Sequence, residues 1–211
     1  TSRVFELSSG LTASISGLTI SGGNVTGASG GGILSHGSLT LTAVAIDGNS
    51  AGSGAGGGVA ATGTLNVIDS TISNNDAVLS GAIYPFGVAI LNIKNSTLSG
   101  NSTINVGGAI TESGTSLGSL TTIENSTITN NSTTAANGGG IFASRSPIIR
   151  STIIAGNTAG STPDVFGAFN SQGYNLVGKA DGSTGFTATG DIIGTISSPL
   201  DPRLTPLANN G

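Results

Sequence analysis

Cysteine, methionine and tryptophan are absent from this sequence of 211 residues, and charged residues make up only 8% of it. Without cysteine, disulfides and thiolate metal sites are excluded. The single histidine, His36, cannot build a histidine metal site or a catalytic triad. The six Lys and Arg are scattered in a chain of net charge −4, so we expect neither nucleic acid nor an anionic membrane surface as a partner. The most apolar stretch, 78–93, is broken by glycine, serine and proline, so no membrane span is predicted.

Glycine, by contrast, is abundant at 36 residues, and regular apolar spacing favours an ordered, turn-rich chain over a disordered one. Two apolar columns and one asparagine column share a period of 26 residues, interrupted once by a step of 30. The excess lies after Ile110, within 111–119. The columns are Ile15, Leu41, Val67, Ile93, Ile123 and Ile149; Ile20, Ile46, Ile72, Leu98, Ile128 and Ile154; and Asn49, Asn75, Asn101, Asn131 and Asn157.

The local pattern within each repeat is that of β-strands. Apolar residues alternate with polar ones, as in Leu39-Thr40-Leu41, and the residues are good strand formers. Glycine and asparagine separate the short runs, where turns need a left-handed backbone. The sequence therefore predicts an all-β, single-stranded parallel β-helix of about eight rungs of roughly 26 residues. Regular rungs cover 1–157, and 158–211 form irregular final rungs and an extended C-terminal segment of the same domain.

Stacking explains why the repeat is spelled so uniformly. In a β-helix, equivalent side chains of successive rungs lie one above the other, so identical apolar residues bury one another. The asparagine column can pass amide hydrogen bonds from rung to rung, as in other stacked strands. The two apolar columns are therefore the predicted core, and the asparagine column is a predicted structural ladder.

Two sets of motifs resemble known surface proteins. The repeats Gly-Gly-Ala-Ile and Ser-Thr-Ile-x-x-Asn are similar to those of polymorphic outer-membrane proteins, with Ile or Leu in place of Phe. The segments 173–178, 190–192, 201–204 and 206–211 resemble the choice-of-anchor Q proteins of bacteria. The resemblance implies a right-handed β-helix at an extracellular or cell-surface location. It supplies no catalytic residues.

Three groups of side chains are candidates for chemistry. No two acids stack on adjacent rungs, as polysaccharide cleavage would require, so we predict no catalytic, metal or cofactor site. Lys94, Glu124 and Arg150 form a column that is either a binding patch for a sugar acid or, more simply, a ladder of ion pairs. A sugar-binding groove could instead combine Glu112 with Tyr84 and Phe86, although a rung-filling aromatic pair is the simpler interpretation. A threonine column, Thr19, Thr71, Thr97 and Thr127, would suit ice binding, but strand propensity also explains it.

The predicted function is that of a non-enzymatic extracellular or cell-surface structural protein: a rod, an adhesin segment or a matrix subunit. Neither end has an evident cap, and the strand expected over Val4–Leu7 offers an open edge. Copies of the chain are therefore expected to associate end to end, and a head-to-tail contact of this kind builds filaments. The alternative is a β-helix that binds or cleaves a cell-surface polysaccharide.

Overall fold

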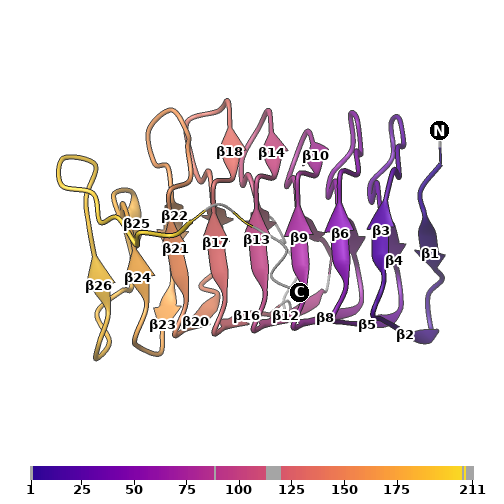
Figure 1. Cartoon of the computed structure of the whole chain (residues 1–211), viewed down its shortest axis with the longest axis horizontal. Coiled ribbons are helices and arrows are strands. Elements are labelled where there is room, and N and C mark those ends of the chain that lie inside the picture. The colour runs from indigo at the N-terminus through magenta and orange to yellow at the C-terminus, as the bar shows by residue number, and fades with distance from the viewer. Residues whose placement is uncertain (1, 88, 113–119, 206, 208–211) are drawn as a thin grey trace.

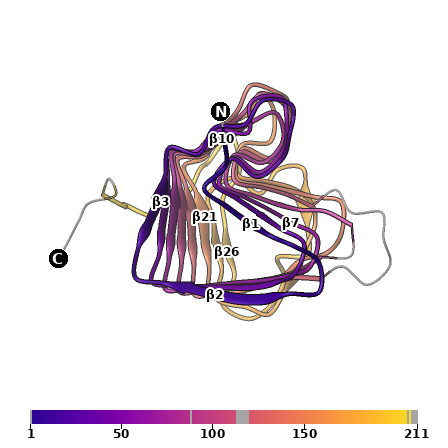
Figure 2. The same cartoon turned by 90° about the vertical axis from the view of Figure 1, so that its right-hand side faces the viewer.

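The computed structural model describes residues 2–87, 89–112, 120–205 and 207. Over these residues the protein is all-β, with 26 short strands and no helix. The chain coils so that each strand pairs in parallel with its equivalent one turn later, and Figure 1 shows the coils stacked along one axis. Viewed down that axis in Figure 2, the strands superimpose into the sides of a tube. The predicted parallel β-helix, or β-solenoid, is confirmed.

Four parallel sheets run along the solenoid. Sheet A contains β1 (Phe5–Leu7), β4 (Ile33–Ser35), β7 (Val59–Ala61), β11 (Ile83–Pro85), β15 (Ile110–Glu112), β19 (Ile141–Ala143), β22 (Val165–Ala168) and β25 (Ser183–Thr184). Sheet B contains β2 (Thr12–Ser16), β5 (Ser38–Thr42), β8 (Thr64–Ile68), β12 (Ile90–Lys94), β16 (Leu120–Glu124), β20 (Ile148–Arg150) and β23 (Asn170–Ser171). Sheet C contains β3 (Thr19–Ser21), β6 (Ala45–Asp47), β9 (Thr71–Ser73), β13 (Thr97–Ser99), β17 (Thr127–Thr129), β21 (Ile153–Ala155), β24 (Leu176–Val177) and β26 (Ile192–Ile193). The small sheet D contains β10 (Asp76–Ala77), β14 (Ser102–Thr103) and β18 (Ser132–Thr133).

The two apolar columns have the predicted register. Ile15 pairs with Leu41 at the start of the column in sheet B, and Ile123 pairs with Ile149 near its end. The corresponding column of sheet C runs without interruption into β24 and β26. The step of 30 separates β12 from β16; of the predicted insertion at 111–119, residues 113–119 lie outside the described part.

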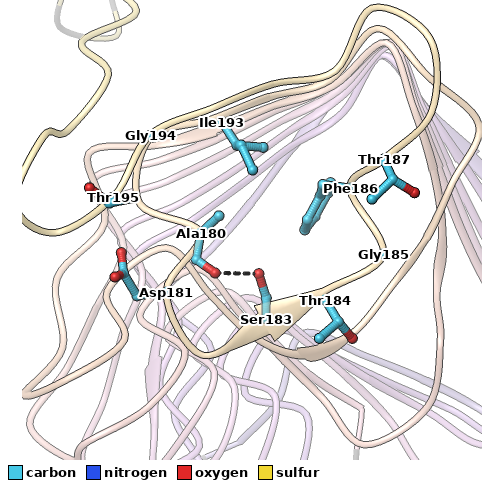
Figure 3. A pocket seen from close by; sticks show the side chains of 10 residues that line it. All are labelled: Ala180, Asp181, Ser183, Thr184, Gly185, Phe186, Thr187, Ile193, Gly194 and Thr195. Atoms are coloured by element: carbon cyan, nitrogen blue, oxygen red, sulfur yellow. Dashed lines mark hydrogen bonds between the residues drawn. The ribbon is translucent and has the colours of Figure 1, made fainter.

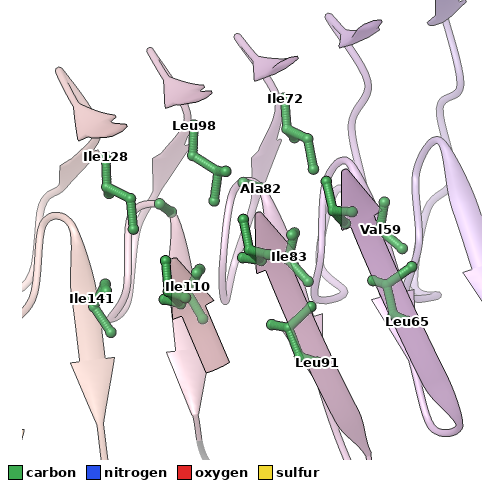
Figure 4. Packing of buried hydrophobic residues seen from close by; sticks show 14 of the residues in the cluster. Val59, Leu65, Ile72, Ala82, Ile83, Leu91, Leu98, Ile110, Ile128 and Ile141 are labelled. Carbon is green, nitrogen blue, oxygen red and sulfur yellow. The ribbon is translucent and has the colours of Figure 1, made fainter. Parts of the chain in front are cut away.

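The core is a continuous stack of aliphatic side chains inside the tube. The columns of sheets A and C face each other across it, as Figure 4 shows for Ile83 and Ile72. Both residues are 0% exposed. Since burial of one such side chain is worth about 1.5–3 kcal/mol, the stack rather than any single rung stabilises the fold.

Each corner of the tube repeats one backbone conformation. Between sheets B and C, the residue after each sheet B strand is left-handed: φ is 50° at both Asp69 and Asn95, 49° at Asn125 and 48° at Ser151. Asparagine and aspartate tolerate this region better than other residues with a side chain, which explains why they recur at the corner. The corner therefore presents one polar side chain per rung to solvent.

The five asparagines of the predicted ladder lie buried, one above the other. In each, the backbone N–H and the side-chain Nδ2 both donate to Oδ1 of the next asparagine, at 2.9–3.1 Å. Nδ2 also donates to a carbonyl of the preceding rung, as from Asn75 to Ile46. The ladder thus satisfies donors that the turn would otherwise bury unpaired.

A second ladder, which the sequence did not reveal, follows the B–C corner. Buried hydroxyls accept from the backbone N–H one rung earlier, as Ser96 does from Ser70 and Ser126 from Ser96. Thr152 and Asn175 continue it. The hydroxyls simultaneously donate to the carbonyl two residues back, so one small side chain fixes both its own turn and the rung before it.

Both ladders end on an aspartate at the C-terminal side. Asp164 Oδ1 accepts from the backbone N–H and from Nδ2 of Asn157, at 2.8 and 2.9 Å. In the second ladder, Asp191 Oδ1 accepts the same pair of bonds from Asn175. A carboxylate only accepts, so it closes a series in which every member donates to the next. The C-terminal end therefore does have the stop that the sequence seemed to lack.

The chain then turns back along the outside of sheet C, as Figure 1 shows. Leu200 N–H donates to the carbonyl of Gly178. A Cβ at Gly194 would lie 2.6 Å from Leu200 N, so only glycine lets the returning segment lie this close. Leu204 and Leu207 border a cavity over Thr97 and Thr127, which places part of the predicted threonine column beneath this segment.

Candidate functional site

The column of Lys94, Glu124 and Arg150 lies at the outer end of sheet B, on three successive rungs. The three side chains are in register, but the predicted ion-pair ladder is not formed. Within the described residues the single ion pair is Arg3–Glu6, at 3.3 Å. Long exposed side chains gain little from pairing in water and lose rotamer freedom. The two cations and the carboxylate therefore remain separate charges.

These charges line a groove along the B–C corner, which we call the corner groove. It has a volume of about 290 Å³ and is lined by Lys94, Glu124, Asn125, Arg150 and Ser151. The last residue of each sheet B strand supplies the charge, and the left-handed residue after it supplies an amide or a hydroxyl. The groove is therefore a product of the repeat, filled with charge on three rungs only.

Tyr174 extends the corner by one rung. Ser151 N–H donates to the carbonyl of Gly173, so the following residue, Tyr174, occupies the corner beside Ser151. It is left-handed with φ 61° and 63% exposed. Sequence reasoning missed this residue because the corner step is 23 residues here rather than 26.

The groove offers binding groups rather than a reactive centre: two cations, one carboxylate, an amide and a hydroxyl, next to an exposed aromatic ring. No protein family, curated protein or solved structure matches the chain. The functional interpretation therefore depends on the geometry of this site and of the two ends. Among the described residues, no group of three His, Cys, Asp or Glu could hold a metal ion, and no helix could cross a membrane.

Tyr84 and Phe86 do stack, with ring centroids 5.6 Å apart and planes at 12°. Tyr84 is half-buried on the outer face of sheet A, between two inward-facing neighbours of β11, so it does not fill the inside of a rung as predicted. His36 packs edge-on against Phe86 at 6.4 Å, and its Nδ1 lies 3.1 Å from the Thr62 hydroxyl. It is thus part of this aromatic cluster rather than an exposed turn residue.

Glu112 does not share a surface with these rings, because it points into the tube and is 5% exposed. It stacks on Ala143 of the next rung, and Thr121 beside it takes the place of Leu91. Desolvation raises the pKa of Glu112, against smaller lowering effects of the Thr121 hydroxyl and the Arg145 charge. Its Oε2 has no hydrogen-bond partner among the described residues. A sugar-binding groove of Tyr84, Phe86 and Glu112 is therefore not formed.

Each end of the solenoid opens onto the core. At the N-terminal end, a cavity of about 180 Å³ lies among Phe5, Leu7, Ile15 and Leu39. At the C-terminal end, a larger cavity of about 380 Å³ has Phe186 and Ile193 on its walls, as Figure 3 shows. Apolar side chains are exposed around both ends: Val4, Phe5, Leu11 and Leu18 at the first, and Ile192, Ile193 and Ile196 at the second.

Proposed function

We propose that the protein is a non-enzymatic structural protein of the cell surface or extracellular space, which serves as a stiff rod in an adhesin, a stalk or a matrix. The observation that carries this proposal is the unbroken stack: each rung is bound to the next by three parallel sheets and by two ladders of buried side chains. Because no rung can bend without breaking several of these hydrogen bonds, the stack resists bending and stretching.

The proposal includes membership of the choice-of-anchor Q proteins, with the right-handed coil and surface location that this resemblance implies. Its support is that the resembling motifs form the C-terminal end of the solenoid. Asn175 and Asp191 close one ladder, and Gly178 and Gly194 receive the returning segment. Antibody labelling of intact source cells tests the location. Labelling that appears only after permeabilisation would contradict it.

We further propose that copies associate head to tail. The N-terminal end leaves one edge of β1, β2 and β3 without a partner in the described structure, and such edges pair readily with other strands. Both ends expose apolar side chains around a cavity, so a contact between them would bury apolar surface on each partner. A contact between two different surfaces of identical copies extends indefinitely and builds filaments.

Sedimentation and electron microscopy over a range of concentrations test this assembly. Leu11→Asp at one end and Ile192→Asp at the other should each abolish it, since a head-to-tail contact uses both surfaces. Ile104→Asp is the matched control, because Ile104 is 64% exposed away from both end cavities. Wild-type protein that stays monomeric at every concentration would refute the assembly.

A further inference from the structure

We propose that the corner groove and Tyr174 form a binding site for a linear acidic polysaccharide whose sugars carry carboxylates. The polysaccharide would run along the solenoid axis, over the rungs of β12, β16 and β20 and onto Tyr174. This proposal goes beyond the structural role and does not depend on end-to-end assembly, because all of its residues lie on the side of one rod.

The charges of the groove match such a ligand in sign and spacing. Lys94 and Arg150 are exposed, lie outside any ion pair of the described residues, and stand two rungs apart, which is about 10 Å. Arginine binds a carboxylate through two parallel hydrogen bonds, and lysine acts as a point charge. Glu124 between them repels anions but accepts hydrogen bonds from sugar hydroxyls. The order cation, carboxylate, cation therefore favours a chain with spaced carboxylates over one densely covered with sulfates.

The floor of the groove is already fixed before a ligand arrives. Asn125 and Ser151 occupy the left-handed corner, and their N–H groups donate to the carbonyls of Arg150 and Gly173, at 3.1 and 3.0 Å. Their polar side chains are thereby held at one-rung intervals. Since consecutive sugars of an extended chain advance by a distance close to one rung, the amide and the hydroxyl can serve neighbouring sugars with little ordering cost.

Tyr174 adds the aromatic surface on which a sugar ring can stack. A left-handed conformation is strained for so bulky a residue, yet the fold places it here with 63% of its surface exposed. One side of its ring lies over Gly190, where a Cβ would be 2.5 Å from the ring. Glycine at that position leaves space for the ring, and the exposed side of the ring can take the apolar face of a sugar.

Isothermal titration calorimetry with an oligogalacturonate of defined length tests the site, with a neutral cello-oligosaccharide of equal length for comparison. We expect saturable binding of the acidic chain alone, weakening as salt is added. K94Q and R150Q should each weaken binding on the order of tenfold, the value of one charge-assisted hydrogen bond at a partly exposed site. Y174L should weaken it about fivefold, whereas Y174F should bind as the wild type does.

R203Q is the matched control, because it removes one exposed positive charge that does not line the groove. Circular dichroism of every variant establishes that the fold is retained. The proposal is overturned if the oligogalacturonate does not bind at millimolar concentration, or if the neutral chain binds equally well. It is also overturned if R203Q weakens binding as much as K94Q and R150Q do, or if a sulfated chain of equal length binds more tightly.

Discussion

Replacement of Asp164 tests whether a carboxylate closes the asparagine ladder. Asp164 is 0% exposed, and its Oδ1 accepts both donors of the equally buried Asn157. Asp164→Ala leaves these two donors without an acceptor and out of reach of water, at about 1–3 kcal/mol each. Asp164→Asn retains the accepting oxygen. The alanine variant should therefore be about 2–6 kcal/mol less stable than the asparagine variant.

The same residue predicts a pH dependence. Desolvation raises the pKa of Asp164, outweighing the hydrogen bonds from Asn157 and the charge of Lys179. The folded protein thus keeps this proton at pH values where the unfolded chain has lost it. The contribution of Asp164 to stability is complete below the ordinary pKa of 3.8 and declines as the pH rises through the folded value. Asp164→Asn, which has no proton to lose, should gain on the wild type as the pH rises.

Guanidinium chloride unfolding followed by circular dichroism from acid to neutral pH measures both effects. Asp69→Asn is the control, since it removes an exposed carboxylate from a corner that Asn95 occupies one rung later. Equal stability of the alanine and asparagine variants of Asp164 would refute its role as the end of the ladder. A pH response of the asparagine variant identical to that of the wild type would refute the assignment of the proton.

Other changes test the remaining elements of the stack. Asn101→Ala should cost about 2–6 kcal/mol in unfolding free energy, because two buried donors of the preceding rung lose their acceptor. Gly194→Ala should speed proteolytic cleavage within 195–205, because its Cβ would displace the returning segment. Replacing Glu112 by Ala and Thr121 by Leu together, as in neighbouring rungs, should stabilise the fold. That gain should be larger at neutral than at acid pH, because burial raises the pKa of Glu112; a double-mutant cycle at two pH values measures it.

The regular part of the fold was predictable because stacking forces equivalent residues into one spacing. Leu41 and Val67 are 26 residues apart in the sequence and paired in the structure, and the same spacing identified the asparagines before any contact was known. The hydroxyl ladder escaped notice for a chemical reason: Ser96 and Ser126 have the same spacing, but serine is common throughout the chain, so its repetition carried little signal.

The residues that end the coil and line its corner were not predictable from the period. Asp164 follows Asn157 by only 7 residues, because the chain returns to the ladder in a shortened turn. Tyr174 is shifted for the same reason. The charged column was found, but its register could not reveal whether the side chains pair. Glu112 was assigned to a surface because its neighbouring rungs carry Ala143 and Pro85 rather than another charge, and a small inward-facing residue gives no sign of burial.

The ladders have a direction, and this direction bears on assembly. Every member donates to the rung on its C-terminal side, so the last rung needs a group that only accepts, and Asp164 and Asp191 provide it. Neither ladder can therefore continue into a second copy docked at the C-terminal end. A head-to-tail junction would depend on strand pairing and apolar contact alone, which makes it weaker than any joint within the rod. Mild sonication of filaments should then release folded fragments whose lengths, by electron microscopy, are whole multiples of one subunit. Fragments of arbitrary length with lost circular dichroism would show that the junction is as strong as the rod and that this account of the ladders is wrong.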